Sequence, residues 1–336
     1  MANKEPLLEV RNLTTEYITD QGVIRAVDGA CLTVNRGEAV GVAGESGCGK
    51  STLALSILRV LPSNGRIVGG EILFERRNLL DLSEEEMQRV RWKEISIVLQ
   101  GAMNALNPVK RVGEQVVEPL LIHGMVDSLE EALERGKELF SMVGIDPSRL
   151  KDYPHEFSGG MKQRAMIAMA LACNPKLVIA DEPTTALDVM VQAQILDLME
   201  ELQKKLALSL ILITHNLSVI AEACDRVYIM YAGKIVEFGS VEDIFEKPLH
   251  PYTEGLLGCF PNIASGERRL HYIPGVPPAL LSPPGGCRFH PRCPYAKEIC
   301  KRVEPPLIEV ERGRFVACHL QGEGRVYSLA SAASKR

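Results

Sequence analysis

Long hydrophobic runs are missing from this sequence. Its longest apolar stretches, residues 177–180 and 210–213, have the length of a strand and fall far short of the roughly 18 residues that a membrane-spanning helix needs. The first six residues show no apolar run after a basic start, so no secretory signal is predicted. We therefore expect a chain that does not cross a membrane and remains in the cytosol.

An excess of positive charge is also absent. The chain has 38 Lys and Arg against 43 Asp and Glu, a net charge of -5, which gives none of the broad cationic surface that a nucleic-acid binder needs. Nucleic acid is therefore not an expected partner. The hydrophobic fraction of 46% and charged fraction of 24% over 336 residues predict a large packed core with an accessory module, not a disordered chain.

The first third of the chain alternates between strand and helix signals. Residues 7–42 alternate apolar and polar side chains between turn signals at 20–22 and 35–37, which predicts antiparallel strands leading into a core strand at 39–43. The pattern becomes helical after Ser51 and ends near Pro62. A strand, a glycine-rich loop and a helix are thus expected in that order.

The remainder divides into three parts. A mostly helical subdomain is predicted at about residues 103–169, with a capping box at Ser128 and Glu131. Two strand-turn-helix units follow, at 177–180 and 210–214, and favour an α/β core with a mostly parallel sheet. Past residue 241 proline and glycine dominate without periodicity. We expect a nucleotide-binding domain over residues 1–240 and a small loop-rich module over 241–336.

One segment fits the phosphate-loop pattern G-x-x-x-x-G-K-[ST] between the expected strand and helix. Glycines let the backbone curl so that its N–H groups and the helix N-terminus point at phosphate oxygens. The lysine then reaches the β- and γ-phosphates and the following serine binds Mg²⁺. The predicted ATP-binding residues are Gly44, Glu45, Ser46, Gly47, Cys48, Gly49, Lys50 and Ser51, with Thr52 beside them.

A second candidate site lies where the apolar strand 177–180 ends in two adjacent carboxylates, Asp181 and Glu182. Adjacent strand residues point to opposite faces, so the two can take different roles. Asp181 can hold Mg²⁺, and Glu182 can face the water that attacks the γ-phosphoryl group. A solvated loop start is the alternative reading of such a pair, but the phosphate loop upstream favours the functional one.

The segment 157–164, Phe-Ser-Gly-Gly-Met-Lys-Gln-Arg, resembles the signature motif of the ABC ATPases. The resemblance covers about the first three-quarters of the chain, and other elements of that family stand in the expected order. They are Tyr17 like the adenine-stacking aromatic, Gln100 like the Q-loop glutamine, Ala186-Leu187-Asp188 like the D-loop and His215 like the switch histidine.

This resemblance implies a shared site. Ser158, Gly159 and Gly160 would offer donors from a helix N-terminus to the γ-phosphate bound by a second subunit. Two ATPase chains would then enclose two ATP molecules, with Gln100 contributing to the Mg²⁺ site and His215 contacting the γ-phosphate. A lone histidine or an aromatic near a turn is by itself more often structural than functional, so His215 and Tyr17 depend on the resemblance.

Further motifs resemble the dipeptide and oligopeptide importer ATPases. Residues 250–253, 275–278 and 287–294 resemble their C-terminal region, and Met161 in the signature suits that branch. Gly101 and Ala102 stand where that branch commonly has an acidic residue and proline. The resemblance implies two transmembrane permeases, a second similar ATPase subunit, an extracytoplasmic solute-binding protein and a place on the cytoplasmic face of the membrane.

Other functions are also compatible with the sequence. The same motor could serve an oligosaccharide importer. A soluble ABC ATPase acting on nucleic acid usually has two ATPase halves or long coiled coils, and neither is seen in this sequence. A regulator that binds a nucleotide without hydrolysing it is disfavoured, because the residues expected for hydrolysis are all present: Lys50, Asp181, Glu182 and His215.

Four of the nine cysteines crowd near the C-terminus in the spacing C-x5-C-x6-C-x17-C. In a reducing cytosol, two disulfides are disfavoured. Structural zinc usually shows ligand pairs two to four residues apart, which this spacing lacks, although zinc remains an alternative. The uneven spacing suits a 4Fe-4S cluster, which the resembling importers with such a tail also carry. The expected ligands are Cys287, Cys293, Cys300 and Cys318.

Overall fold

The structure, a computed structural model, describes residues 6–101, 105–185, 187–259, 273–322 and 325–326. Its contacts divide the chain into two compact units. Unit 1 comprises Met1–Leu7, Val34–Ala39 and Asp81–Ile213, and unit 2 comprises Leu8–Thr33, Val40–Leu80 and Thr214–Arg336. Within the described ranges, no helix is both long enough and apolar enough to span a membrane.

Unit 1 contains three parallel strands whose side chains are all buried. They are β6 (Ile95–Val98), β7 (Leu177–Asp181) and β8 (Ser209–Thr214). Continuous apolar strands of this kind are typical of a parallel sheet covered on both faces. The register pairs Val98 with Ala180, so the carboxyl ends of β6 and β7 meet at one edge of the sheet. The two predicted strand-turn-helix units are confirmed, with α6 (Val189–Leu206) after β7.

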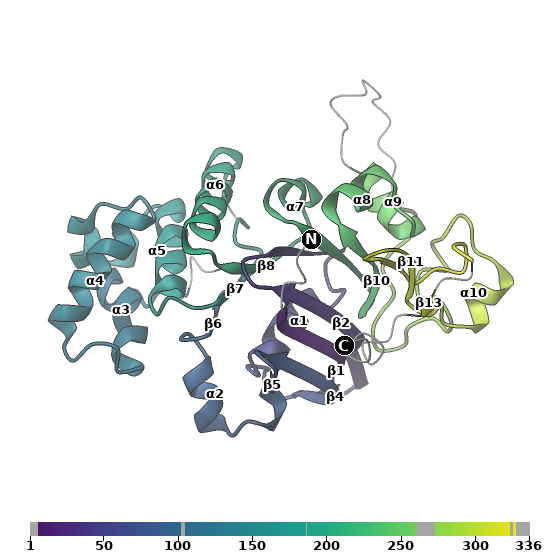
Figure 1. Cartoon of the computed structure of the whole chain (residues 1–336), viewed down its shortest axis with the longest axis horizontal. Coiled ribbons are helices and arrows are strands. Elements are labelled where there is room, and N and C mark those ends of the chain that lie inside the picture. Colours follow the sequence, from purple (N-terminus) through teal and green to yellow (C-terminus); the bar gives the residue numbers. More distant parts are fainter. Residues whose placement is uncertain (1–5, 102–104, 186, 260–272, 323–324, 327–336) are drawn as a thin grey trace. The chain divides into compact units, whose positions relative to one another are not determined.

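The helical part of unit 1 is also confirmed. Two short 3₁₀ turns, Pro147–Lys151 and Pro154–Glu156, join its helices, and α2 (Glu84–Val90) precedes β6. The three main helices pack on one another (Figure 1). They are α3 (Val112–Ile122), α4 (Leu129–Met142) and α5 (Gly159–Leu171).

The predicted capping box at the start of α4 forms only in half. Ser128 accepts a hydrogen bond from the Glu131 N–H at 3.2 Å, as expected for an N-cap. The Glu131 carboxylate, however, accepts from the N–H of Asp127 at 3.0 Å, not from that of Ser128. The side chain therefore reaches one residue farther back than the motif requires.

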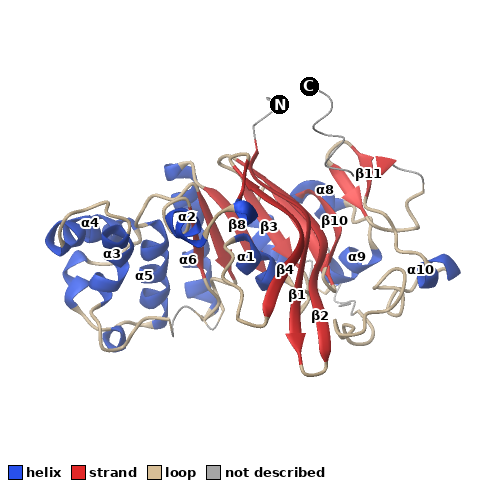
Figure 2. Ribbon diagram, turned by 90° about the horizontal axis from the view of Figure 1, so that it is seen from below, coloured by secondary structure: helices blue, strands red, loops and turns tan. Residues whose placement is uncertain are grey.

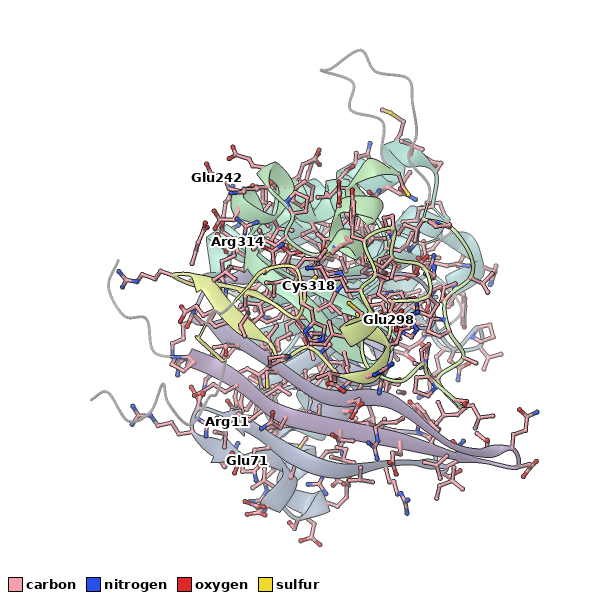
Figure 3. The ribbon with its side chains drawn as sticks, turned by 90° about the vertical axis from the view of Figure 1, so that its right-hand side faces the viewer. Arg11, Glu71, Glu242, Glu298, Arg314 and Cys318 are labelled. Atoms are coloured by element: carbon pink, nitrogen blue, oxygen red, sulfur yellow. The ribbon has the colours of Figure 1, made fainter. Side chains whose placement is uncertain are left out.

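Unit 2 opens with the antiparallel sheet that the alternating pattern predicts. Its strand order is β2-β1-β4-β5, and the long curved strands are visible in Figure 2. Arg11 of β1 faces Glu71 of β4 in the register and forms an ion pair with it at 3.4 Å (Figure 3). The strands are β1 (Pro6–Thr19), β2 (Gly22–Asn35), β4 (Gly65–Phe74) and β5 (Arg77–Asn78), followed by the 3₁₀ turn Leu79–Asp81.

A second set of strands in unit 2 runs in the order β13-β11-β12-β10-β9-β3. The pair β3–β9 is parallel and the others are antiparallel. Helices α1 (Lys50–Ile57) and α7 (Leu217–Ala223) belong to the same unit. The strands are β3 (Ala39–Ala43), β9 (Arg226–Tyr231), β10 (Lys234–Ser240), β11 (Ile308–Glu311), β12 (Arg314–Val316) and β13 (Arg325–Val326).

Besides the strands β11, β12 and β13, the C-terminal part of unit 2 contains short helices joined by loops, so its composition predicted the loops but not the strands. The helices are α8 (Val241–Glu246), α9 (Pro251–Gly258) and α10 (Glu298–Arg302). Three buried rings form its core: Tyr231 of β9 lies 4.5 Å from Tyr252 and 5.2 Å from Phe289, measured between centroids. This segment therefore packs directly on a strand of the same unit that pairs with β3.

Candidate functional site

The predicted phosphate loop connects β3 to α1, and its backbone requires glycine at two positions. Gly44 has φ of +154° and Gly49 has φ of +109°. A Cβ atom would lie 2.1 Å from the Met230 carbonyl oxygen at Gly44, and 2.1 Å from that of Ala26 at Gly49. Within the described chain, no side chain caps the N-terminus of α1. The first N–H groups of this helix are therefore available to an anion.

Lys50 is buried and points back into the loop. Its Nζ donates to the carbonyl oxygens of Gly44 at 2.7 Å and Glu45 at 3.0 Å, while its side chain lies near Cys48 Sγ at 3.8 Å. Phosphate oxygens are stronger acceptors than these carbonyls because the hydrogen bond is then charge-assisted on both sides. The ammonium group is thus held where it can bind an anion that enters the loop.

Two more predicted residues lie beside α1. The Tyr17 hydroxyl is 3.3 Å from Thr52 Oγ1, and the Tyr17 ring lies over Gly65, whose Cβ position would be 2.8 Å from the ring. The ring is half-buried, which leaves one part of it accessible for stacking. His215, at the end of β8, is exposed and belongs to the same unit.

The hydrolytic candidates of unit 1 meet at the edge where β6 and β7 end. Gln100 follows β6 and Glu182 follows β7, so the parallel register brings their side chains together. Gln100 Nε2 donates to Glu182 Oε2 at 2.8 Å. Thr185 Oγ1 donates to the same oxygen at 3.0 Å. The carboxylate is therefore oriented by two neutral donors.

The backbone at Glu182 is unusual, since φ is +46°. Its N–H donates to the Ile213 carbonyl oxygen at 2.8 Å, which ties the turn to β8. Asp181, one residue earlier, is only 3% exposed. The two adjacent carboxylates thus differ in environment as predicted, one buried and one partly exposed, but the cause is the left-handed turn at Glu182 after the strand and not alternation within a strand.

The signature residues stand at the start of α5. Ser158 accepts from the Met161 N–H at 3.3 Å and caps the helix. Gly159 and Gly160 follow, and a Cβ at Gly160 would lie 2.7 Å from Val191 of α6. Asp188 caps α6 by accepting from the Val191 N–H at 3.0 Å. Ala186 and Ala102 lie outside the described residues.

The four C-terminal cysteines line one cavity. All are free thiols, and the remaining lining includes His250, His290 and His319. Burial, with a smaller contribution from the neighbouring cysteines, raises the pKa of Cys318 to about 11. Among the described residues, no group of three or more His, Cys, Asp or Glu side chains is arranged to hold a metal ion. The structure therefore brings the predicted cysteines to one cavity without a converged single-ion site.

His250 adds an unpartnered polar atom to this cavity. The residue is 2% exposed, and its Nδ1 accepts from the Tyr252 N–H at 3.0 Å. Burial lowers the pKa of His250 to about 3, so the ring is neutral and its proton lies on Nε2. No hydrogen-bond partner for this Nε2 occurs in the described chain. A buried donor of this kind favours an acceptor inside the cavity.

Sequence reasoning missed Thr185, Tyr252 and Arg292 as residues next to the predicted sites. Thr185 had a local signal, a hydroxyl three residues after a carboxylate at a strand end. Tyr252 and Arg292, by contrast, contact Glu45 of the phosphate loop from positions 207 and 247 residues away. No local pattern predicts contacts over such separations.

Two known families match the chain. The ABC transporter family matches residues 27–185, which include the phosphate loop, the signature residues and Glu182. A family described as the oligopeptide/dipeptide transporter C-terminal region matches residues 236–300, which include the first three of the clustered cysteines. The predicted resemblance thus holds for both parts of the chain.

Individual relatives match nearly end to end. The chain is 51% identical to a probable peptide ABC transporter ATP-binding protein of Sinorhizobium fredii, covering 94% of this chain and 96% of that one. It is 48% identical to the oligopeptide transport ATP-binding protein OppD of Salmonella typhimurium, with 93% of each covered. It is 44% identical to the dipeptide transport ATP-binding protein DppD of Caldanaerobacter subterraneus, with 95% and 98% covered.

A solved structure agrees with these relatives. The dimeric ATP-binding cassette MJ0796, in a post-hydrolysis state with ADP and Pi, superimposes with a TM-score of 0.63 at 28% identity, over 70% of this chain and 98% of that one. The fold is that of an ABC nucleotide-binding domain with mixed α/β sheets. The phosphate loop, the signature helix and the relatives together show that the chain belongs to the ATP-binding subunits of ABC transporters, in the peptide-transporter branch.

Proposed function

We propose that this chain binds MgATP, hydrolyses it and thereby energises the uptake of short peptides through partner permeases. The phosphate loop carries this proposal, because its positive-φ glycines, uncapped helix N-terminus and buried Lys50 form a site for a polyphosphate. The names of the relatives, which are peptide, oligopeptide and dipeptide transport proteins, support the cargo class.

On the nucleotide side, Lys50 turns from the loop carbonyls to the β- and γ-phosphates, and the loop N–H groups hold the phosphate oxygens. Tyr17 stacks on the adenine, and Thr52 is positioned beside it by the shared hydroxyl contact. Ser51, Asp181 and Gln100 would hold Mg²⁺, which would supply charge neutralisation at the phosphates. Such oxygen donors suit this ion.

On the hydrolytic side, Glu182 accepts a proton from the attacking water and orients it. Gln100 and Thr185 hold the carboxylate by their hydrogen bonds to Oε2. His215 donates a hydrogen bond to the γ-phosphate. Each of these groups acts through hydrogen bonds and charge, as phosphoryl transfer requires.

The site is completed by a second chain. Ser158, Gly159 and Gly160 at the N-terminus of α5 contact the γ-phosphate held by a partner ATPase subunit, with Asp188 close to that interface. The partner is a second, similar ABC ATPase, and the pair assembles on two transmembrane permeases supplied by an extracytoplasmic solute-binding protein. Residues 1–240 act as the ATPase domain and 241–336 as an accessory module, at the cytoplasmic face of the membrane.

Reconstitution tests the function and the cargo together. The assembled complex in proteoliposomes is expected to take up labelled di- and oligopeptides in an ATP-dependent manner, and Lys50→Ala should abolish both uptake and hydrolysis. Uptake of oligosaccharides but not of peptides would show that the transporter carries oligosaccharides. ATP hydrolysis stimulated by nucleic acid, with no association with permeases, would contradict the transport function.

The accessory module is proposed to hold a 4Fe-4S cluster bound by Cys287, Cys293, Cys300 and Cys318. Four thiols around one cavity and the unpartnered Nε2 of His250 support this group. A single zinc ion needs sulfurs converging at about 2.3 Å from one point, whereas a sulfur-bridged cluster holds its ligands farther apart. When bound, the cluster supplies cross-links between loops and so adds folding energy.

Metal analysis distinguishes the candidates. Anaerobically purified protein is expected to contain about four iron and four sulfide per chain. Cys293→Ser should lose iron, while Cys259→Ser, a substitution of an exposed cysteine outside the cavity, should retain it. Stoichiometric zinc without iron would show that the cysteines bind zinc and not a cluster. Two disulfides without any metal would refute both metal sites.

A further inference from the structure

Glu45, the second residue of the phosphate loop, is fixed from three directions. Its N–H donates to the Tyr252 hydroxyl at 2.8 Å. Its carboxylate accepts two hydrogen bonds from the Arg292 guanidinium, at 2.6 Å to Oε2 and 2.9 Å to Oε1. Its carbonyl oxygen accepts from Lys50 at 3.0 Å. Two of these three anchors, Tyr252 and Arg292, come from the segment after residue 241.

Arg292 is itself held rigidly. Its side chain is 6% exposed, and its Nε donates to the Pro274 carbonyl oxygen at 2.8 Å. The guanidinium also lies 5.8 Å from the ring centroid of Tyr231 and donates to the Tyr231 hydroxyl at 3.3 Å. The paired Glu45 carboxylate raises the pKa of Arg292. A bidentate pair with both partners placed by packing is the geometry in which an ion pair is specific and strong.

The charge of Glu45 makes this pair important for the loop. The phosphate loop must receive an anion of several charges, and an unpaired carboxylate beside Gly44 would repel it, particularly where burial lowers the dielectric. The Glu45 side chain is 25% exposed, so water alone screens it only in part. Arg292 neutralises this carboxylate and fixes its direction. Removing the arginine would leave a charge on the loop and release one of its three anchors.

We propose that Arg292 is a positioning residue for nucleotide binding, which holds and neutralises Glu45 so that the phosphate loop keeps its anion-binding conformation. The C-terminal module thereby sets the affinity for ATP without contacting the nucleotide. This inference rests on the proposed ATP-binding function of the loop.

The test is a double-mutant cycle in the full chain, with Arg292→Gln, Glu45→Gln and the double variant. Binding of MgATP is measured by titration calorimetry. Arg292→Gln is expected to weaken ATP binding about tenfold, or about 1.4 kcal/mol. In the Glu45→Gln background the same change should alter the affinity less than about threefold, because the carboxylate to be neutralised is gone. In the assembled complex, KM for ATP should rise with Arg292→Gln while kcat at saturating ATP stays within about twofold.

A matched control is Arg288, which lies four residues before Arg292 in the C-terminal segment. It forms its ion pair with Asp28 of β2 and not with the phosphate loop. Arg288→Gln removes a similarly buried guanidinium and is expected to change the melting temperature but not ATP affinity. If Arg292→Gln fails to fold by circular dichroism, Arg292→Lys retains the charge without the fork and should weaken binding about threefold.

Three results would overturn the inference. They are wild-type ATP affinity in folded Arg292→Gln, an equal loss of affinity with and without the Glu45→Gln substitution, and an equal loss in Arg288→Gln. An equal loss in both backgrounds would mean that Arg292 acts on the nucleotide without Glu45. Failure of the proposed function looks different, because the wild-type chain itself would then not bind ATP.

Discussion

At Glu182 the backbone adopts a left-handed conformation with φ of +46°, which costs a residue with a side chain about 1 kcal/mol or more. The Ile213 carbonyl oxygen and the donors Gln100 and Thr185 fix the residue in that state. The turn thus places a carboxylate, oriented from two sides, directly after a buried strand. Strain at a position with such supports favours a functional role for the residue.

Replacing Glu182 by glutamine should leave MgATP binding unchanged and lower turnover by at least about 100-fold, because an amide cannot take a proton from water. The charge at the buried Asp181 is unaltered by this change. Steady-state phosphate release by the assembled complex measures the effect. Glu201→Gln, on the exposed surface of α6, is the control and should match the wild type. Turnover near the wild-type rate in Glu182→Gln would refute the assigned role.

Thr185→Val tests the positioning of that carboxylate. Valine has the same shape but cannot donate to Glu182 Oε2, so one hydrogen bond of about 1 kcal/mol is lost. We expect kcat to fall about fivefold with KM for ATP unchanged. Thr184→Val, the same change one residue earlier, should have no effect on kcat. Equal rates in the two variants would show that Thr185 does not position the base.

At the scale of elements, β10 anchors the start of α9 through one buried carboxylate. Glu237 is fully buried and accepts from the N–H groups of Leu249 at 2.8 Å and His250 at 2.9 Å. Arg314 of β12, also buried, lies 3.8 Å from the same carboxylate. A single side chain therefore satisfies two backbone donors and one cation that packing has removed from water.

Glu237→Ala should lower the free energy of unfolding by about 3 kcal/mol, because it leaves the two N–H groups and Arg314 without this acceptor. Glu311→Ala removes the other carboxylate near Arg314. The side chain of Glu311 is 61% exposed. That variant should change stability by less than about 0.5 kcal/mol. Denaturant titration of both variants measures the difference. Similar losses of unfolding free energy in the two variants would mean that the buried contacts of Glu237 stabilise the fold no more than the exposed ion pair of Glu311.

Helices, strands and loops were predicted correctly where local sequence patterns determine them. The phosphate loop, the strands around it and the helical subdomain were predicted because glycine spacing and hydrophobic periodicity are local properties. The half-formed box at Ser128 shows the limit, since the motif does not say which N–H the glutamate will reach. Contacts such as Arg292 with Glu45 depend on how β9 and the C-terminal loops pack, and periodicity has no information on that pairing.

At the scale of the whole molecule, the isolated chain should hydrolyse ATP weakly. Its Ser158 helix terminus and its phosphate loop are proposed to act on different nucleotides, so each site needs a second chain. Mixing the chain with its permeases and its partner ATPase should raise the specific rate by at least about tenfold. Sedimentation of the same samples reports self-association. A monomer that hydrolyses as fast as the full complex would rule out the shared site.

The contact between Glu45 and Arg292 spans 247 residues, and this separation has a consequence during biosynthesis. At about 5–20 residues per second, a ribosome needs roughly 12–50 s to travel that distance. The nascent phosphate loop therefore leaves the exit tunnel long before the arginine that completes it. The complete set of contacts around the loop can therefore form only after Arg292 has been synthesised, so the growing chain can bind ATP at its full affinity only from that point on.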